Sequence, residues 1–164
     1  IEKTYYGYDR DLYPDVDWID AITNKWAHNT RLNLNVGGGS ERLRYALTAS
    51  YYNEKGIMAT DENLSYDTSS KLNRVNLRAN VDLDVTKTTV LRFNIGGYLQ
   101  MLRKSNSSTD EVFAKAFETP PFVHPAVYSD GTIPLASALR SNPWAMATQN
   151  GYYRGTEGKI ESLF

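Results

Sequence analysis

The stretch Leu72–Val85, LNRVNLRANVDLDV, decides the fold that the sequence predicts. From Arg74 onward, apolar and polar residues alternate without interruption. Successive side chains of a β-strand point to opposite faces of the sheet, so the stretch predicts a strand with one apolar and one polar face. The apolar residues are Val75, Leu77, Ala79, Val81, Leu83 and Val85, and the polar residues are Arg74, Asn76, Arg78, Asn80, Asp82 and Asp84. The length suits a tilted strand that crosses a bilayer.

The following segment, Val90–Met101, repeats this pattern and predicts the second strand of a hairpin. Its apolar face carries Leu91, Phe93, Ile95, Gly97, Leu99 and Met101, and its polar face carries Arg92, Asn94, Gly96, Tyr98 and Gln100. Another predicted hairpin precedes it, with strands that begin near Arg31 and near Leu43. We expect the glycine-rich segment 37–41, GGGSE, to form its tight turn.

The connections between these strands alternate between short and long. In outer-membrane barrels the short turns lie on the periplasmic side and the long loops outside. The sequence therefore predicts an all-β fold: an antiparallel transmembrane β-barrel segment of about four to five strands, with long extracellular loops and short helices. We expect one partial barrel domain over 1–164, divided into a loop and short helix (1–30), a hairpin (31–52), an outer loop (53–71), a hairpin (72–101), an outer loop (102–157) and the start of a further strand (158–164).

Local signals predict short helices within the loops. Asp17 has the character of an N-cap, with Trp18, Ile22 and Trp26 on one helix face. The pair Ser108 and Glu111 has capping-box spacing, before a helix that the prolines at 120 and 121 end. The first eighteen residues are expected to form a loop. Its tyrosines either pack on one another or offer a stacking surface to sugars or peptides.

Composition and motifs exclude several functions. The net charge is −1, with basic residues dispersed among acidic ones, so binding to nucleic acid is not expected. The absence of cysteine excludes disulfides, thiol nucleophiles and cysteine metal sites. We predict no catalytic, cofactor or metal site: His28 and His124 have no second ligand at metal-site spacing, and a structural or solvated role is expected for both. The sequence starts without Met or a signal segment and stops within an expected strand, so we expect an internal segment of a larger protein.

Several stretches, taken together and in this order, resemble the SusC/RagA family of TonB-linked outer-membrane proteins. They are YPDVDWIDAI (13–22), HNTRLNLNVGGGSERLRYALTASYYNEKGIM (28–58), KLNRVNLRANVDLDVTKTTVLRFNIGG (71–97), TPPF (119–122), SDG (129–131) and NPW (142–144). The resemblance covers nearly the whole chain. It rests on the order and spacing of these stretches, because none of them is diagnostic alone.

The resemblance implies a bacterial outer-membrane transporter and not an enzyme. It implies a barrel of about twenty-two strands around an N-terminal plug. The implied cargo is glycans or peptides, the implied partners are a SusD-like surface lipoprotein and outer-membrane lipid, and TonB would act through an N-terminal region that this sequence lacks. No cofactor is implied.

The polar faces of the predicted strands would line the barrel lumen. The residues expected to make polar contacts there are Arg74, Asn76, Arg78, Asn80, Arg92, Asn94 and Tyr98. The wider predicted lumen face adds Arg31, Asn33, Asn35, Arg42, Arg44, Thr48, Ser50, Asp82 and Gln100. In a plugged barrel such side chains bond the plug and trapped water, and some of them could contact substrate.

Two other functions compete with transport. A soluble β-sandwich that binds carbohydrate would use the many tyrosine and tryptophan residues, and its apolar faces would pack on each other. An enzyme is a more distant alternative. A glycosidase needs two carboxylates across a cleft, whereas the acids of this chain lie in loops or near a strand end.

Overall fold

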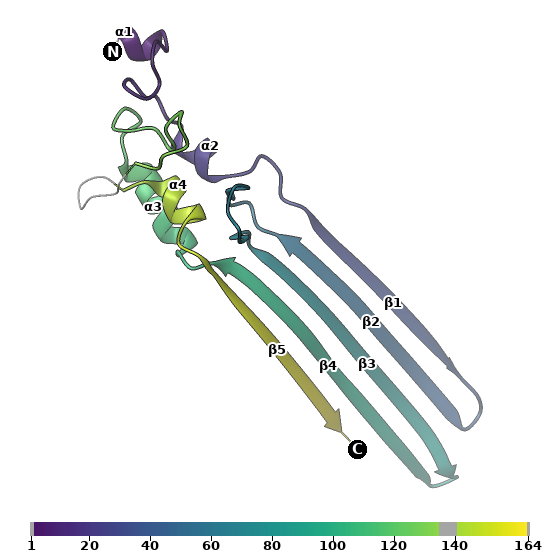
Figure 1. Cartoon of the computed structure of the whole chain (residues 1–164). Helices are drawn as coiled ribbons and strands as arrows, with labels where there is room; N and C mark the ends of the chain where they lie inside the picture. The colour runs from purple at the N-terminus through teal and green to yellow at the C-terminus, as the bar shows by residue number, and fades with distance from the viewer. Residues whose placement is uncertain (1, 135–140, 164) are drawn as a thin grey trace. The chain divides into compact units, whose positions relative to one another are not determined.

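The computed structural model describes residues 2–134 and 141–163 of the chain (Figure 1). Residues 135–140 of the predicted outer loop, and Phe164 at the end of the last predicted strand, lie outside these ranges. The described residues form two compact units. One comprises 2–27, 56–70 and the described part of 103–153, and the other comprises 28–55, 71–102 and 154–163.

The strands of the described residues form one five-stranded antiparallel sheet in the order β1-β2-β3-β4-β5 (Figure 1). Their bounds are β1 Asn29–Gly39, β2 Leu43–Lys55, β3 Lys71–Thr86, β4 Thr89–Ser105 and β5 Tyr152–Leu163. Neighbours in the sequence are neighbours in the sheet, so the topology is a meander with β1 and β5 at its edges. The predicted antiparallel sheet is confirmed.

The register keeps the faces that alternation predicts. Leu34 lies opposite Ala49, and Ala49 lies opposite Leu77, so apolar residues of three strands share one face. The neighbouring row, Asn33, Ser50 and Asn76, is polar and lies on the other face. Because side-chain orientation has a period of two, a register shift by a single residue would mix the two faces.

The turn between β1 and β2 differs from the prediction. Gly37–Gly39 belong to β1, and Ser40–Arg42 make the turn. Ser40 closes this turn, because its N–H donates to the Leu43 carbonyl at 2.6 Å and its Oγ accepts from the Leu43 N–H at 3.3 Å. The glycines provide space: a Cβ on Gly38 would stand 2.7 Å from the Tyr45 Oη, and none of the three has a positive φ.

The unit that comprises 2–27, 56–70 and the described part of 103–153 contains the helices. They are α1 Glu2–Tyr5, α2 Trp18–Ile22, α3 Thr109–Glu118 and α4 Pro143–Thr148. Helices α2, α3 and α4 contact one another around a small buried core. That core consists of Trp18, Ile22, Met58, Val112, Ala116 and Ala147. No helix among the described residues combines the length and the apolar character that crossing a bilayer requires.

Helix α2 begins as predicted but ends earlier. The Asp17 carboxylate accepts from the backbone N–H groups of Ile19 and Asp20, at 3.0 and 3.1 Å, which confirms the N-cap. Trp26, expected on the same helix face, lies beyond the helix and is 80% exposed. The chain leaves the helix because Thr23 is extended and forms a β-bridge with Met58.

Other boundaries also differ from the prediction. Ser108 is the N-cap of α3, but its side chain makes no capping hydrogen bond, so the capping box is not formed. Helices α1 and α4 were not expected. The strand expected from 158 begins at Tyr152. Its first residues were not predicted because apolar and polar residues do not alternate at 152–157. Strands β2 and β4 continue past the predicted hairpin ends at 52 and 101.

Candidate functional site: the two faces of the sheet

The apolar face of the sheet is uncovered within the described residues. Leu34 is 63% exposed and Leu77 is 61% exposed. An open hollow of about 770 Å³ lies over this face, lined mainly by Leu34, Val36, Leu47, Ala49, Val75, Leu77, Ile95, Leu99 and Ile160. Water-soluble monomers rarely expose a continuous apolar surface that spans several strands. The strands of the described residues belong to one sheet, so the sheet-on-sheet packing of a sandwich is not present in them.

The polar face brings together some of the residues predicted to line a lumen. The guanidinium of Arg74 lies over the Tyr98 ring, 4.1 Å from its centroid, and its Nε donates to Asn76 Oδ1 at 2.9 Å. Asn76 Nδ2 in turn donates to Ser50 Oγ on β2 at 3.0 Å. These contacts link β2, β3 and β4 through side chains as well as through the backbone.

The remaining predicted lumen residues continue along the same strands without joining this cluster. Arg78 lies beside Gly96: a Cβ built on Gly96 would stand 3.6 Å from the Arg78 Nε. Asn80 lies opposite Ala46 in the register. Arg92 and Asn94 belong to β4. Contact of any of these residues with a plug or a substrate stays a prediction.

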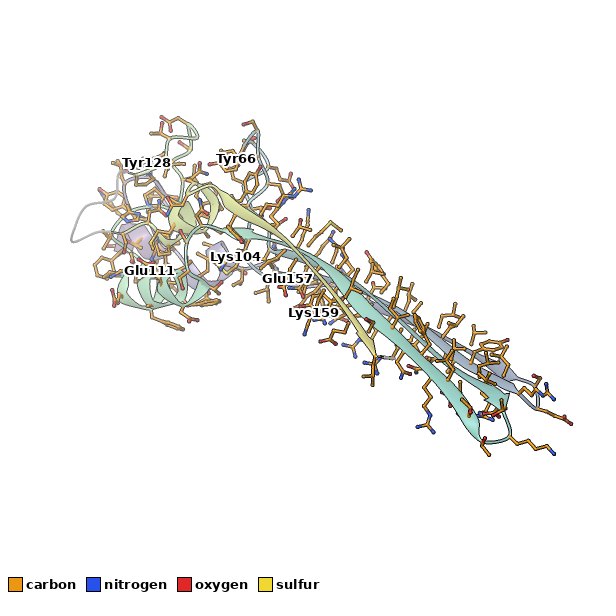
Figure 2. The ribbon with its side chains drawn as sticks, turned by 90° about the horizontal axis from the view of Figure 1, so that it is seen from below. Tyr66, Lys104, Glu111, Tyr128, Glu157 and Lys159 are labelled. Carbon is orange, nitrogen blue, oxygen red and sulfur yellow. The ribbon has the colours of Figure 1, made fainter. Side chains whose placement is uncertain are left out.

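The polar face also includes residues that were not predicted from the sequence, among them Tyr52 and Glu157. Tyr52 lies opposite Arg31 and Arg74, and its hydroxyl donates to Glu54 Oε2 at 2.7 Å. Continuing the alternation of β2 past Ser50 would have placed Tyr52 on this face. Glu157 accepts a hydrogen bond from the Tyr98 hydroxyl and extends from β5 (Figure 2). It was missed because the start of β5 was not recognised.

A bidentate ion pair fixes β2 against β3 near the short turns. The Arg44 nitrogens bind the two Asp84 oxygens at 3.0 and 2.9 Å. In the register Arg44 lies opposite Asp82, so the pair is diagonal. The Arg44 side chain is about half exposed, so the pair is a surface salt bridge, a kind that contributes little to stability.

In the unit that contains the helices, side-chain bonds join stretches far apart in the sequence. Asp61 accepts from the backbone N–H of Asn63 at 3.0 Å and from Gln149 Nε2 at 2.9 Å. These bonds lower the pKa of the Asp61 carboxyl, and the Asn63 backbone bond contributes most. The hydroxyl of Tyr66, labelled in Figure 2, donates to the Gln149 carbonyl at 2.9 Å. The segment after β2 is thereby tied to the end of α4.

His124 and the N-terminal tyrosines complete the residues considered from the sequence. His124 is buried against Trp18, and its ring nitrogens lie 2.9 and 3.2 Å from the carbonyl oxygens of Pro125 and Ser141. These contacts agree with the structural role expected for it. Tyr5, Tyr6 and Tyr8 contact one another edge to face and stay largely exposed, so their use as a stacking surface for sugars or peptides stays a prediction.

The chain shows a weak similarity to a known protein. No protein-family model matches the chain. The chain is similar to TonB-dependent receptor P3 of Formosa agariphila, with 26% identity over 147 residues that cover 83% of this chain and 13% of that protein. The chain thus spans a small part of this relative's length. The similarity agrees with the predicted class of TonB-dependent receptor, whereas the narrower SusC/RagA assignment stays a prediction.

Proposed function

We propose that this chain is a wall segment of an outer-membrane β-barrel, within a TonB-dependent transporter. The observation that carries the proposal is the uncovered apolar face that four neighbouring strands share, backed by a polar face rich in arginine and asparagine. The similarity to a TonB-dependent receptor supports the same class. In this arrangement the apolar face contacts lipid and the polar face lines the lumen.

The free edges of the sheet imply further strands. β1 and β5 each leave a row of backbone N–H and C=O groups without a partner in the described sheet. In hydrocarbon an unpaired backbone group costs several kcal/mol, so membrane strands belong to closed barrels. On this proposal other strands of the same protein pair with both edges. The short turns 40–42 and 87–88 face the periplasm, and the longer connections after β2 and β4 face outside.

The cargo and the partners are part of the proposal and rest on the resemblance to the SusC/RagA family. We assign the transporter to import of glycans or peptides, with a SusD-like lipoprotein at the outer face and TonB as the energy-coupling partner. The chain would then supply wall and loops and carry no catalytic step. Release of product from a candidate glycan or peptide by the purified protein would contradict this last point.

The experiment that tests the proposal places a charge on each face. In the full-length protein, Leu77→Arg changes the proposed lipid face and Asn80→Arg changes the polar face three residues away. Asn80 is the better control than Asn76, because Asn76 bonds both Ser50 and Arg74. We expect Leu77→Arg to reduce the folded, heat-modifiable species in outer membranes, and Asn80→Arg to leave most of it. A detergent-free monomer would instead support the soluble sandwich.

A further inference from the structure

A row of alternating arginine and tyrosine side chains crosses the polar face of the sheet. Arg31 of β1, Tyr52 of β2 and Arg74 of β3 are direct partners in the register. The Arg31 guanidinium lies over the Tyr52 ring at 5.2 Å, and the Arg74 guanidinium lies over the Tyr98 ring at 4.1 Å. Each arginine is therefore held by the face of an aromatic ring.

The carboxylates of this region are held by the tyrosines. The Tyr52 hydroxyl donates to Glu54, and the Tyr98 hydroxyl donates to Glu157. Arg74 bonds only neutral amides, Asn76 Oδ1 at 2.9 Å and Gln100 Oε1 at 3.5 Å. Within the described ranges, neither Arg31 nor Arg74 has a carboxylate at ion-pair distance. Both arginines therefore keep unpaired charge.

Arg31 and Arg74 both line a groove of about 460 Å³. Its polar walls are Arg31, Asn33, Ser50, Tyr52, Arg74, Asn76 and Gln100. A guanidinium that lies over the face of a ring can still offer N–H groups in its own plane to a further acceptor. That is the geometry in which arginine binds a carboxylate through two parallel hydrogen bonds. Asn33 and Ser50 add neutral hydrogen-bonding groups beside the two cations.

The groove also lies at a particular end of the sheet. Arg31 and Arg74 stand near the starts of β1 and β3, away from the turns 40–42 and 87–88. If the proposed function is right, this end faces outside, where an imported molecule arrives first. We propose that the groove binds a carboxylate group of the incoming ligand, with Arg31 and Arg74 as its cationic donors. This inference rests on the proposed function only for the direction from which the ligand comes.

The test measures the reactivity of individual arginines in the full-length protein in outer-membrane vesicles. Phenylglyoxal modifies accessible guanidinium groups, and peptide mass spectrometry reports the rate at each site. Sodium acetate is the minimal carboxylate probe, and sodium chloride at equal ionic strength is its control. Oligogalacturonate, with a neutral galactose oligomer of equal length as control, tests the same group on a sugar. We expect both carboxylate probes to protect Arg31 and Arg74 saturably. Arg44, already bound to Asp84, should show no saturable protection by either probe.

Variants separate this site from general electrostatics. Because hydrogen bonds to charged groups contribute about 1.5–3 kcal/mol, Arg74→Gln should raise the acetate concentration that half-protects Arg31 by about tenfold or more. Arg92→Gln removes the same charge from the polar face of β4, outside the residues that line the groove, and should leave that concentration unchanged. Equal effects of the two substitutions would overturn the site. Heat-modifiable migration of each variant confirms that it has folded.

Other outcomes identify the source of the carboxylate. If Arg31 and Arg74 resist phenylglyoxal without any probe while Arg92 reacts, an acidic side chain of the same protein already fills the groove, and the ligand site is refuted. Reactive arginines that acetate does not protect refute it as well. If the protein migrates as a heat-modifiable barrel in these experiments, the proposed function stands and this inference alone fails. Loss of the barrel signature in the unmodified protein would count against the proposed function instead.

Discussion

Leu77→Arg puts the membrane assignment of the apolar face to a quantitative test. Leu77 lies within the central strand β3, in one row with Ala49 and Leu34, and 61% of it is exposed on this face. Arginine on the lipid face near the midplane costs about 2–4 kcal/mol. Since 1.4 kcal/mol is a factor of ten, the ratio of folded to unfolded protein should fall by about thirty-fold to about seven-hundred-fold.

The control for this substitution is Asn80→Arg on the opposite face of the same strand. Asn80 is half-buried and lies opposite Ala46 on the polar face of the sheet. We expect its cost to stay within about 1 kcal/mol, because substitutions that break no hydrogen bond and leave no buried charge unpaired are usually mild.

The assay is urea unfolding of the full-length protein in detergent or lipid. At each urea concentration, the folded fraction is measured on a gel as the share of unheated protein that migrates faster than heated protein. The shift in the midpoint, at an unchanged slope, gives the difference in free energy of unfolding. Equal destabilisation by Leu77→Arg and Asn80→Arg would refute the reasoning, since it would mean that both faces have the same surroundings. Mild effects at both positions would point to water on both sides of the sheet.

Three further predictions concern the contacts within each unit. A Cβ on Gly97 would overlap the Lys159 carbonyl oxygen, so Gly97→Ala should separate β5 from β4 and raise hydrogen exchange in β5, whereas Gly96→Ala, whose Cβ would meet its nearest atoms at 3.6 Å, should leave β5 protected. A double-mutant cycle on Arg44 and Asp84 should give a coupling of about 0.2–1 kcal/mol that falls in high salt; a larger coupling that salt does not change would indicate a buried pair. The pKa of Asp61 is lower in the folded protein than the ordinary value of 3.8. The charged carboxylate therefore stabilises the fold above pH 3.8, and this stabilisation is lost as the pH falls through the pKa of the folded protein. Hydrogen exchange around 61–66 should therefore rise in acid, and Asp61→Asn should remove much of that pH dependence.

The sequence by itself determined which residues share a face of the sheet. Alternation in β3 and β4 is a local property, because each residue turns its side chain to the face opposite its neighbour's. Antiparallel pairing in register then preserves the alternation from strand to strand, as the row of Leu34, Ala49 and Leu77 demonstrates. The N-cap at Asp17 was equally readable, because the carboxylate bonds backbone groups only two and three residues away.

Contacts between distant segments decided the features that the sequence analysis missed. Helix α2 stops at Ile22 because Thr23 pairs with Met58, which no local signal near 23 reveals. Gly37–Gly39 looked like a turn, yet a side chain is excluded at Gly39 because a Cβ there would stand 2.5 Å from the Leu43 carbonyl oxygen of the partner strand.

The candidate site depends on the same kind of information. Arg31, Tyr52, Arg74 and Tyr98 come from four strands, and each was visible as a polar position on its own strand or by extending the alternation. The sequence did not reveal that each guanidinium lies over a tyrosine ring, because that contact depends on the register between strands. The turn Ser40–Arg42 sets the register of β1 with β2, and the pairing of β2 with β3 carries it to the next strand. Composition and period therefore determined the two faces, whereas the tertiary structure alone placed two arginines without carboxylate partners, within the described residues, along one groove.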